Sequence, residues 1–168
     1  MPCMSQPTQI LNSIELWLQQ NRASDLEQFG TRPILTPKQI EEKIAILPYK
    51  LPKEVIELYK WLHSGHELFL TMPDGNFDRQ MFLNLDRAIS LSIDWENSGV
   101  FTGMRTFPLI TDVYDAIYWT VGSNNQQDVA PIYSNDEATF PSTPDAENLT
   151  AFLTHEFERL QSKRKIDE

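Results

Sequence analysis

The sequence is poor in cysteine, with Cys3 as the single thiol among its 168 residues. One cysteine cannot form an internal disulfide, and it cannot supply the thiolate cluster of a structural metal site. The chain also lacks any apolar run near the ~20 residues that span a bilayer. Its first residues, MPCMSQPTQ, lack the basic and then apolar layout of a secretion signal. We therefore expect a soluble, cytoplasmic protein.

Basic residues are missing from one long stretch. No lysine or arginine lies between Thr106 and Glu158, although the chain carries 14 of them, and the same stretch holds nine of the 24 acids. The net charge is −10. Such a negative field repels nucleic acid and anionic membranes, and it accelerates encounter with a basic partner. An acidic surface is equally an ordinary way to keep a protein soluble. If the charge serves recognition, it favours a basic protein as partner over nucleic acid or a membrane, and solubility is the open alternative.

The motifs of common catalytic sites are also absent. The serine elbow G-x-S-x-G and the glycine-rich phosphate loops do not occur. His63 and His66 have a spacing that metal sites use, but His66 follows a Ser-Gly helix stop, which favours ordinary surface histidines. The carboxylates Asp112 and Asp115 lie in a turn-like polar stretch, which favours solvated groups over acid–base catalysts. We predict no catalytic residue, metal or cofactor.

Helical patterns dominate the first half of the chain. In LPKEVIELYKWL, Pro52 suits a first helical turn, and apolar residues from Val55 to Leu62 recur at the spacing of one helix face. TPKQIEEKIAIL begins with Thr36 and Gln39 in the positions of a capping box. The same reasoning predicts helices over residues 8–21, 36–47, 52–64, 84–99 and 142–165.

Strand patterns are concentrated in the second half. FPLIT, DAIYWTV and VAPIY predict antiparallel strands near residues 107–111, 115–121 and 129–133. The Asp-Gly pair in MPDGNFD predicts an earlier hairpin. Helices before, within and after the strands predict a single-domain α+β fold with a mainly antiparallel sheet. We expect residues 1–35 to form a helical extension that packs on the body formed by residues 36–168.

Aromatic residues alternate with acids in this strand region. Tyr118 and Thr120 point to the face opposite Trp119. A face that presents tyrosines amid carboxylates can stack on arginine and pair with basic side chains. A tyrosine-bearing face covered by a helix is the equally open alternative. The candidate partner-binding residues are Asp112, Asp115, Tyr118, Asp128, Tyr133, Asp136 and Glu137.

The order of these segments resembles the SUKH superfamily, which includes a fungal cell-wall synthesis regulator and many bacterial immunity proteins. The resemblance runs from Thr36 to Leu153 through TPKQIEEKIAIL, LPKEVIELYKWL, the Ser-Gly turn, FLNLDRAISLSIDW, FPLIT, PIY and NLTAFL. Many relatives carry a glycine-rich turn after the FPLIT-like strand, where this chain has Asp112-Val113-Tyr114-Asp115. That departure puts a pocket at this turn in doubt.

The sequence and this resemblance together predict a non-enzymatic protein-binding module. The resemblance implies an immunity protein, and the charge favours a basic toxin domain such as a nuclease as its partner. A housekeeping regulator or scaffold of the same family is one alternative. A small hydrolase or metal-dependent enzyme that uses the histidines and acids is another.

Overall fold

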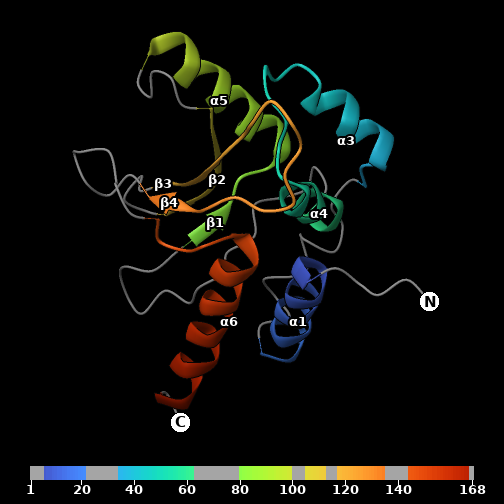
Figure 1. Ribbon diagram of the computed structural model, residues 1–168. Coiled ribbons are helices and arrows are strands. Elements are labelled where there is room, and N and C mark those ends of the chain that lie inside the picture. Colours follow the sequence, from blue (N-terminus) through green and yellow to red (C-terminus); the bar gives the residue numbers. More distant parts are fainter. Residues whose placement is uncertain are drawn as a thin grey trace.

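Residues 6–21, 34–62, 80–99, 105–112, 117–134 and 144–166 are described by the computed structural model (Figure 1). The helices are α1 (Gln6–Asn21), α3 (Pro37–Ile44), α4 (Lys53–Leu62), α5 (Leu85–Ser98) and α6 (Leu149–Ile166). The strands are β1 (Gln80–Phe82), β2 (Thr106–Asp112), β3 (Ile117–Val121) and β4 (Tyr133–Ser134). The predicted α+β class, with helices before and after an antiparallel sheet, is confirmed.

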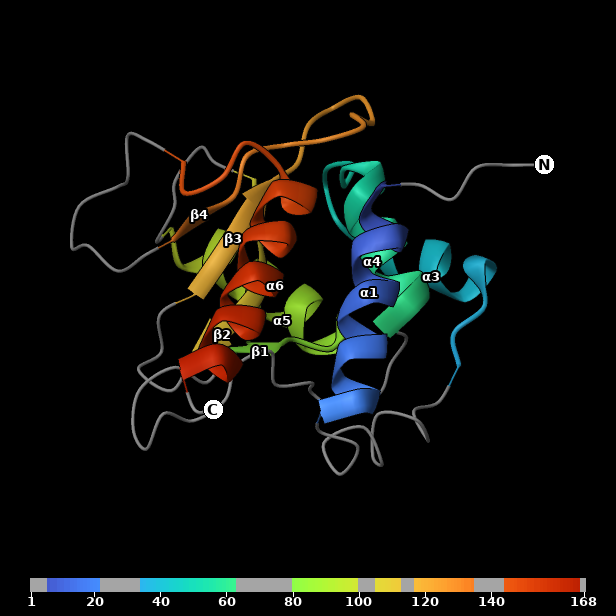
Figure 2. The ribbon, with the colours of Figure 1, turned by 90° about the horizontal axis from the view of Figure 1, so that it is seen from below.

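The sheet has the strand order β1-β2-β3-β4, and each neighbouring pair is antiparallel. Phe82 pairs with Ile110, Pro108 pairs with Trp119, and Trp119 pairs with Tyr133. The register of β2 against β3 shifts between Pro108 and Ile110, a bulge that suits a residue without an N–H. In Figures 1 and 2, α5 lies on one side of the sheet and α6 on the other. The sheet is therefore the middle layer between two helices.

Local capping explains where two of the helices begin. Thr36 accepts a hydrogen bond from the Gln39 N–H, and the Gln39 side chain accepts one from the Thr36 N–H, so the predicted capping box is present. Asn84 caps α5 by accepting from the Arg87 N–H. Gly99 ends the same helix with a φ of 72°, a conformation that costs glycine little.

The last helix starts later than predicted. We expected it to begin at Ser142, but α6 begins at Leu149. The backbone just before it pairs with the sheet region, because Ile132 exchanges hydrogen bonds with Ala146. Asn148 then caps α6 by accepting from the Ala151 N–H at 2.8 Å. A long-range backbone pairing therefore displaced the helix start.

The strand predicted at residues 129–133 is also shorter, since β4 covers only Tyr133–Ser134. Pro131 has no N–H to offer to a ladder, and the Ala130 N–H points instead at the carboxylate of Glu54. This segment is therefore tied to α4 rather than extended as a strand.

The hydrophobic core draws on every layer. α1 contributes Leu11, Ile14 and Leu18, each 0% exposed, and it packs against α4 and α6 (Figures 1 and 2). The predicted face of α4 is buried from Val55 to Leu62. α1 is thus joined to the body, while the division of the chain at residue 35 stays a prediction.

Polar bonds fix α1 on α4 around this apolar contact. The Trp61 indole donates to Glu15 at 2.9 Å, and the Thr8 hydroxyl donates to Glu57 at 3.0 Å. Both bonds join side chains of different helices, so they set the register of α1 along α4.

Some predicted features lie outside the described residues. These are the MPDGNFD hairpin turn, the strand before it, and the Ser64-Gly65 helix stop. Within the described part of the chain, no helix is both long and apolar enough to cross a membrane.

Candidate functional site

A groove of about 480 Å³ lies between β3 and α6. We call it the β3–α6 groove, and the residues that line it are Tyr118, Asp145, Ala146, Glu147, Ala151, Phe152, His155, Glu156 and Arg159. Its three sources are one strand, the segment before α6, and one face of α6. Figure 2 shows α6 lying across β3.

The aromatic floor of the groove joins the strand to the helix. The ring of Tyr118 contacts the ring of Phe152 with centroids 4.9 Å apart. Tyr118 is half-buried, whereas Phe152 is 5% exposed. The helix therefore covers part of the tyrosine-bearing face, and the groove exposes the rest of the Tyr118 ring.

Backbone pairing fixes the acidic rim. The Asp145 N–H donates to the Ile132 carbonyl at 2.8 Å, and Ala146 also pairs with Ile132. The side chains of Asp145 and Glu147 on either side of Ala146 are exposed. Because the backbone at Asp145 is held by the sheet region, Asp145 and Glu147 stay at the edge of the groove that Tyr118 also lines.

A buried carboxylate anchors the same end of α6. Glu54 on α4 is 3% exposed, and it accepts from the Leu149 N–H at 2.8 Å and from Thr150 and Ala130 at 3.4 Å. A negative group at a helix N-terminus also suits the helix dipole. Desolvation by burial raises the pKa of Glu54, while these hydrogen bonds act to lower it. We assign Glu54 a structural role, because it joins α4 to the N-terminus of α6, the helix that forms one side of the groove.

The far end of the groove is neutralised internally. Glu156 is 3% exposed, and both of its oxygens accept from Arg159 at 3.1 Å. This pair cancels one charge of each sign. The acidic character of the groove therefore comes from Asp145 and Glu147, with exposed His155 nearby.

The predicted site residues that the structure describes do not form one cluster. Tyr118 lies in the groove. Tyr133 stacks on buried Trp119, with centroids 4.7 Å apart. Asp128 lies in the loop after β3 and pairs with Lys53 at 3.2 Å. These three predicted residues thus have different surroundings.

Of the other four predicted residues, the structure describes only the backbone of Asp112. Asp112 ends β2, where its backbone pairs with Gln80. Asp115, Asp136 and Glu137 lie outside the described residues, as does the side chain of Asp112. Their part in partner binding stays a prediction.

Sequence reasoning missed Asp145, Glu147 and the α6 face as part of a site. A signal was present, because Phe152, His155, Glu156 and Arg159 recur at the spacing of one helix face. That spacing alone does not say which strand the face meets. The contact between Tyr118 and Phe152 supplied that information.

The alternative of a metal-dependent enzyme depends on the histidines, and the structure describes only one of the three. His63 and His66 lie outside the described residues, and His155 is exposed on α6. In the ranges that the structure describes, histidine, cysteine and acid side chains form no group of three or more suited to a metal ion.

Comparisons with known proteins assign no family to this chain. No protein-family model matches it, and no curated protein is significantly similar to it in sequence. The resemblance to the SUKH superfamily therefore stays a prediction.

Proposed function

We propose that this protein is a non-enzymatic binding module that captures a basic segment of a partner protein in the β3–α6 groove. The observation that carries the proposal is the meeting of Tyr118 with the exposed carboxylates Asp145 and Glu147 in one groove. An arginine or lysine side chain can lie on the tyrosine ring and pair with a carboxylate at the same time. The groove thus offers two attractions to one cation.

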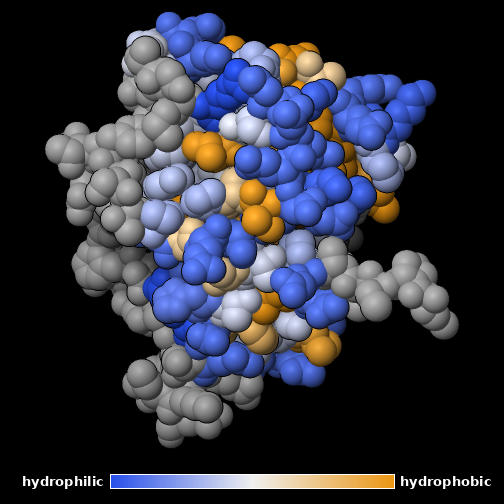
Figure 3. Space-filling model, in the orientation of Figure 1, coloured by the Kyte–Doolittle hydropathy of each residue, from blue (hydrophilic) through white to orange (hydrophobic). Residues whose placement is uncertain are grey.

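The net charge of the chain supports recognition of a basic partner. On the face shown in Figure 3, hydrophobic areas are separated by hydrophilic residues. The whole chain has a net charge of −10, which raises the encounter rate with a basic partner. Charge steers the approach, and the aromatic floor then provides the contact that slows dissociation.

The biological role that we propose is that of an immunity protein, which neutralises a basic toxin domain such as a nuclease. This step rests on the sequence resemblance to the SUKH superfamily together with the charge. The alternative role is that of a housekeeping regulator or scaffold of the same family, and the gene neighbourhood distinguishes the two roles. A toxin gene immediately beside this one supports immunity, whereas its absence weakens that role.

The proposal is tested by measuring association with the partner, identified by pull-down from native extract and then purified. Replacing both Asp145 and Glu147 by lysine should lower the association rate by about tenfold or more. The control is the same double replacement at Asp94 and Glu96, which are exposed on α5 across the sheet. Both variants change the net charge equally, but only the replacement of Asp145 and Glu147 removes the negative charge of the groove. Only that variant should therefore associate more slowly than its change in net charge explains.

Tyr118→Leu tests the aromatic half of the site. The change retains an apolar side chain against Phe152 and removes the ring that stacks on a cation. We expect faster dissociation with little change in the association rate. The partner would be shown to bind elsewhere if the two double lysine variants slowed association equally, or if Tyr118→Leu left the dissociation rate unchanged.

A further inference from the structure

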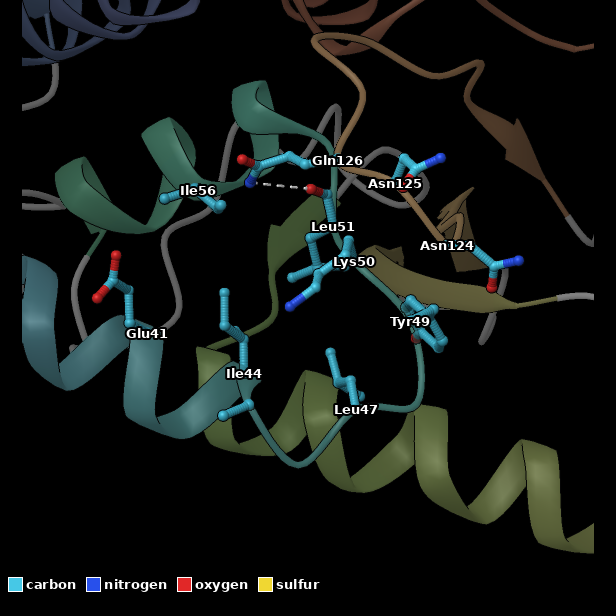
Figure 4. Close-up of a pocket in the computed structure, with 11 residues that line it drawn as sticks. Glu41, Ile44, Leu47, Tyr49, Lys50, Leu51, Ile56, Asn124, Asn125 and Gln126 are labelled. Carbon is cyan, nitrogen blue, oxygen red and sulfur yellow. Dashed lines mark hydrogen bonds between the residues drawn. The ribbon is translucent and has the colours of Figure 1, made fainter.

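A second pocket of about 440 Å³ opens between α3, α4 and the loop after β3. Figure 4 shows Ile44 of α3, Leu51 of the connecting segment and Ile56 of α4 around it. Gln126 and Asn125 lie at the rim that the loop supplies. The pocket therefore combines an aliphatic wall with side-chain amides, and its size falls in the range of small-ligand sites.

Backbone bonds hold the walls in place. The Lys50 N–H donates to the Ser123 carbonyl at 2.8 Å, and the Ser123 N–H donates back to Lys50 at 3.1 Å. The Gln126 amide donates to the Leu51 carbonyl at 3.4 Å, the bond drawn in Figure 4. A ligand entering here meets walls that are already ordered, which lowers the entropic cost of binding.

The pocket carries one charge of each sign. In Figure 4 the ammonium group of Lys50 is directed across the pocket toward Ile44, and Glu41 lies beyond Ile44 on α3. Neither charge forms an ion pair with any residue in the described part of the chain. An opposite charge is thus available at two separate points around one aliphatic wall.

We propose that this pocket binds a small zwitterion with an aliphatic body. Lys50 would pair with its carboxylate and Glu41 with its ammonium group, while Ile44, Leu51 and Ile56 contact the aliphatic part. A ligand with only a carboxylate meets an unpaired Glu41, and an amine meets an unpaired Lys50, so both bind more weakly. This inference concerns a pocket distinct from the β3–α6 groove and does not depend on the proposed function.

Two sources share this chemistry, namely a free aliphatic amino acid and a short aliphatic peptide. Titration of the full chain with L-leucine and with L-leucyl-L-leucine separates them. Methyl NMR signals of Ile44 and Ile56 report on the pocket wall, and calorimetry gives the affinity. The single-charge probes are 4-methylpentanoate and isopentylamine, which retain the aliphatic body.

We expect saturable shifts of the Ile44 and Ile56 methyl signals with at least one zwitterion. Each single-charge probe should bind about tenfold more weakly, which corresponds to one lost hydrogen bond to a charged group. Tighter binding of leucine assigns the site to a free amino acid, and tighter binding of the dipeptide assigns it to a peptide.

Matched variants test the two charges. Lys50→Met and Glu41→Gln should each weaken zwitterion binding by about tenfold. The controls are Lys38→Met and Glu42→Gln, because both residues are exposed on α3 and neither lines the pocket. The proposal is overturned if neither zwitterion binds at millimolar concentration, if the single-charge probes bind as well, or if test and control variants behave alike.

Discussion

At the scale of single residues, the Tyr49 ring packed against Gly122 explains why this position is a glycine. A Cβ added at Gly122 would lie 2.0 Å from Cδ2 of Tyr49, well inside van der Waals contact. The Tyr49 ring cannot move away easily, because its hydroxyl contacts Ser92 and donates to the Thr106 carbonyl at 3.1 Å. Burial of this hydroxyl raises the pKa of Tyr49 to about 12. Glycine is therefore required here for space.

We predict that Gly122→Ala lowers the free energy of unfolding by about 1–3 kcal/mol through overpacking. Urea unfolding measures the loss. The same change made in a Tyr49→Ala background should cost much less, because the ring that it strikes is gone. An equal cost in both backgrounds would place the strain elsewhere.

Glu54 gives a prediction on pH at the same scale. Burial raises the pKa of its carboxyl above the ordinary 4.5, so the folded state retains the proton to a higher pH than the unfolded chain. The stability that this proton contributes is fully present below about pH 4.5 and is lost as the pH rises through the raised pKa. Glu54→Gln, which does not titrate, should lack this part of the pH dependence.

Urea unfolding of the wild type and Glu54→Gln across this pH window measures the difference. Glu42→Gln, at an exposed position on α3, is the control and should follow the wild type. If the stability of Glu54→Gln and wild type changed in parallel with pH, the buried carboxyl would not titrate as proposed.

At the scale of elements, α1 provides a matched pair of side chains. Ile14 is 0% exposed between α1 and the body, whereas Leu16 on the same helix is 55% exposed. Ile14→Ala should cost about 2–5 kcal/mol of stability through a cavity. Leu16→Ala should change it by about 0.5 kcal/mol or less. Chemical unfolding distinguishes them, and equal losses would mean that α1 docks by another face.

Element boundaries show what local patterns can predict. The start of α3 followed from Thr36 and Gln39, because a cap acts on the helix in which it lies. The start of α6 did not follow, since Ala146 pairs with Ile132, which belongs to another part of the chain. Local caps are readable in sequence, while a competing distant partner is not.

At the scale of the whole molecule, the net charge of −10 gives a test of electrostatic steering. The association rate with a basic partner should fall by about tenfold or more between low and high salt, because ions screen the long-range attraction. The dissociation rate should change far less. Stopped-flow kinetics over a salt series measures both, and a salt-independent association rate would remove steering from the proposed function.

The sequence by itself determined the α+β class, the buried face of α4, and the uneven distribution of charge, because helix periodicity, capping and composition are local properties. The tertiary structure decided which residues meet. It placed Tyr118 beside Asp145 and Glu147, set Glu54 beneath the N-terminus of α6, and brought Lys50 and Glu41 to one pocket. Each of these depends on how segments far apart in the chain pack together, which no local pattern specifies.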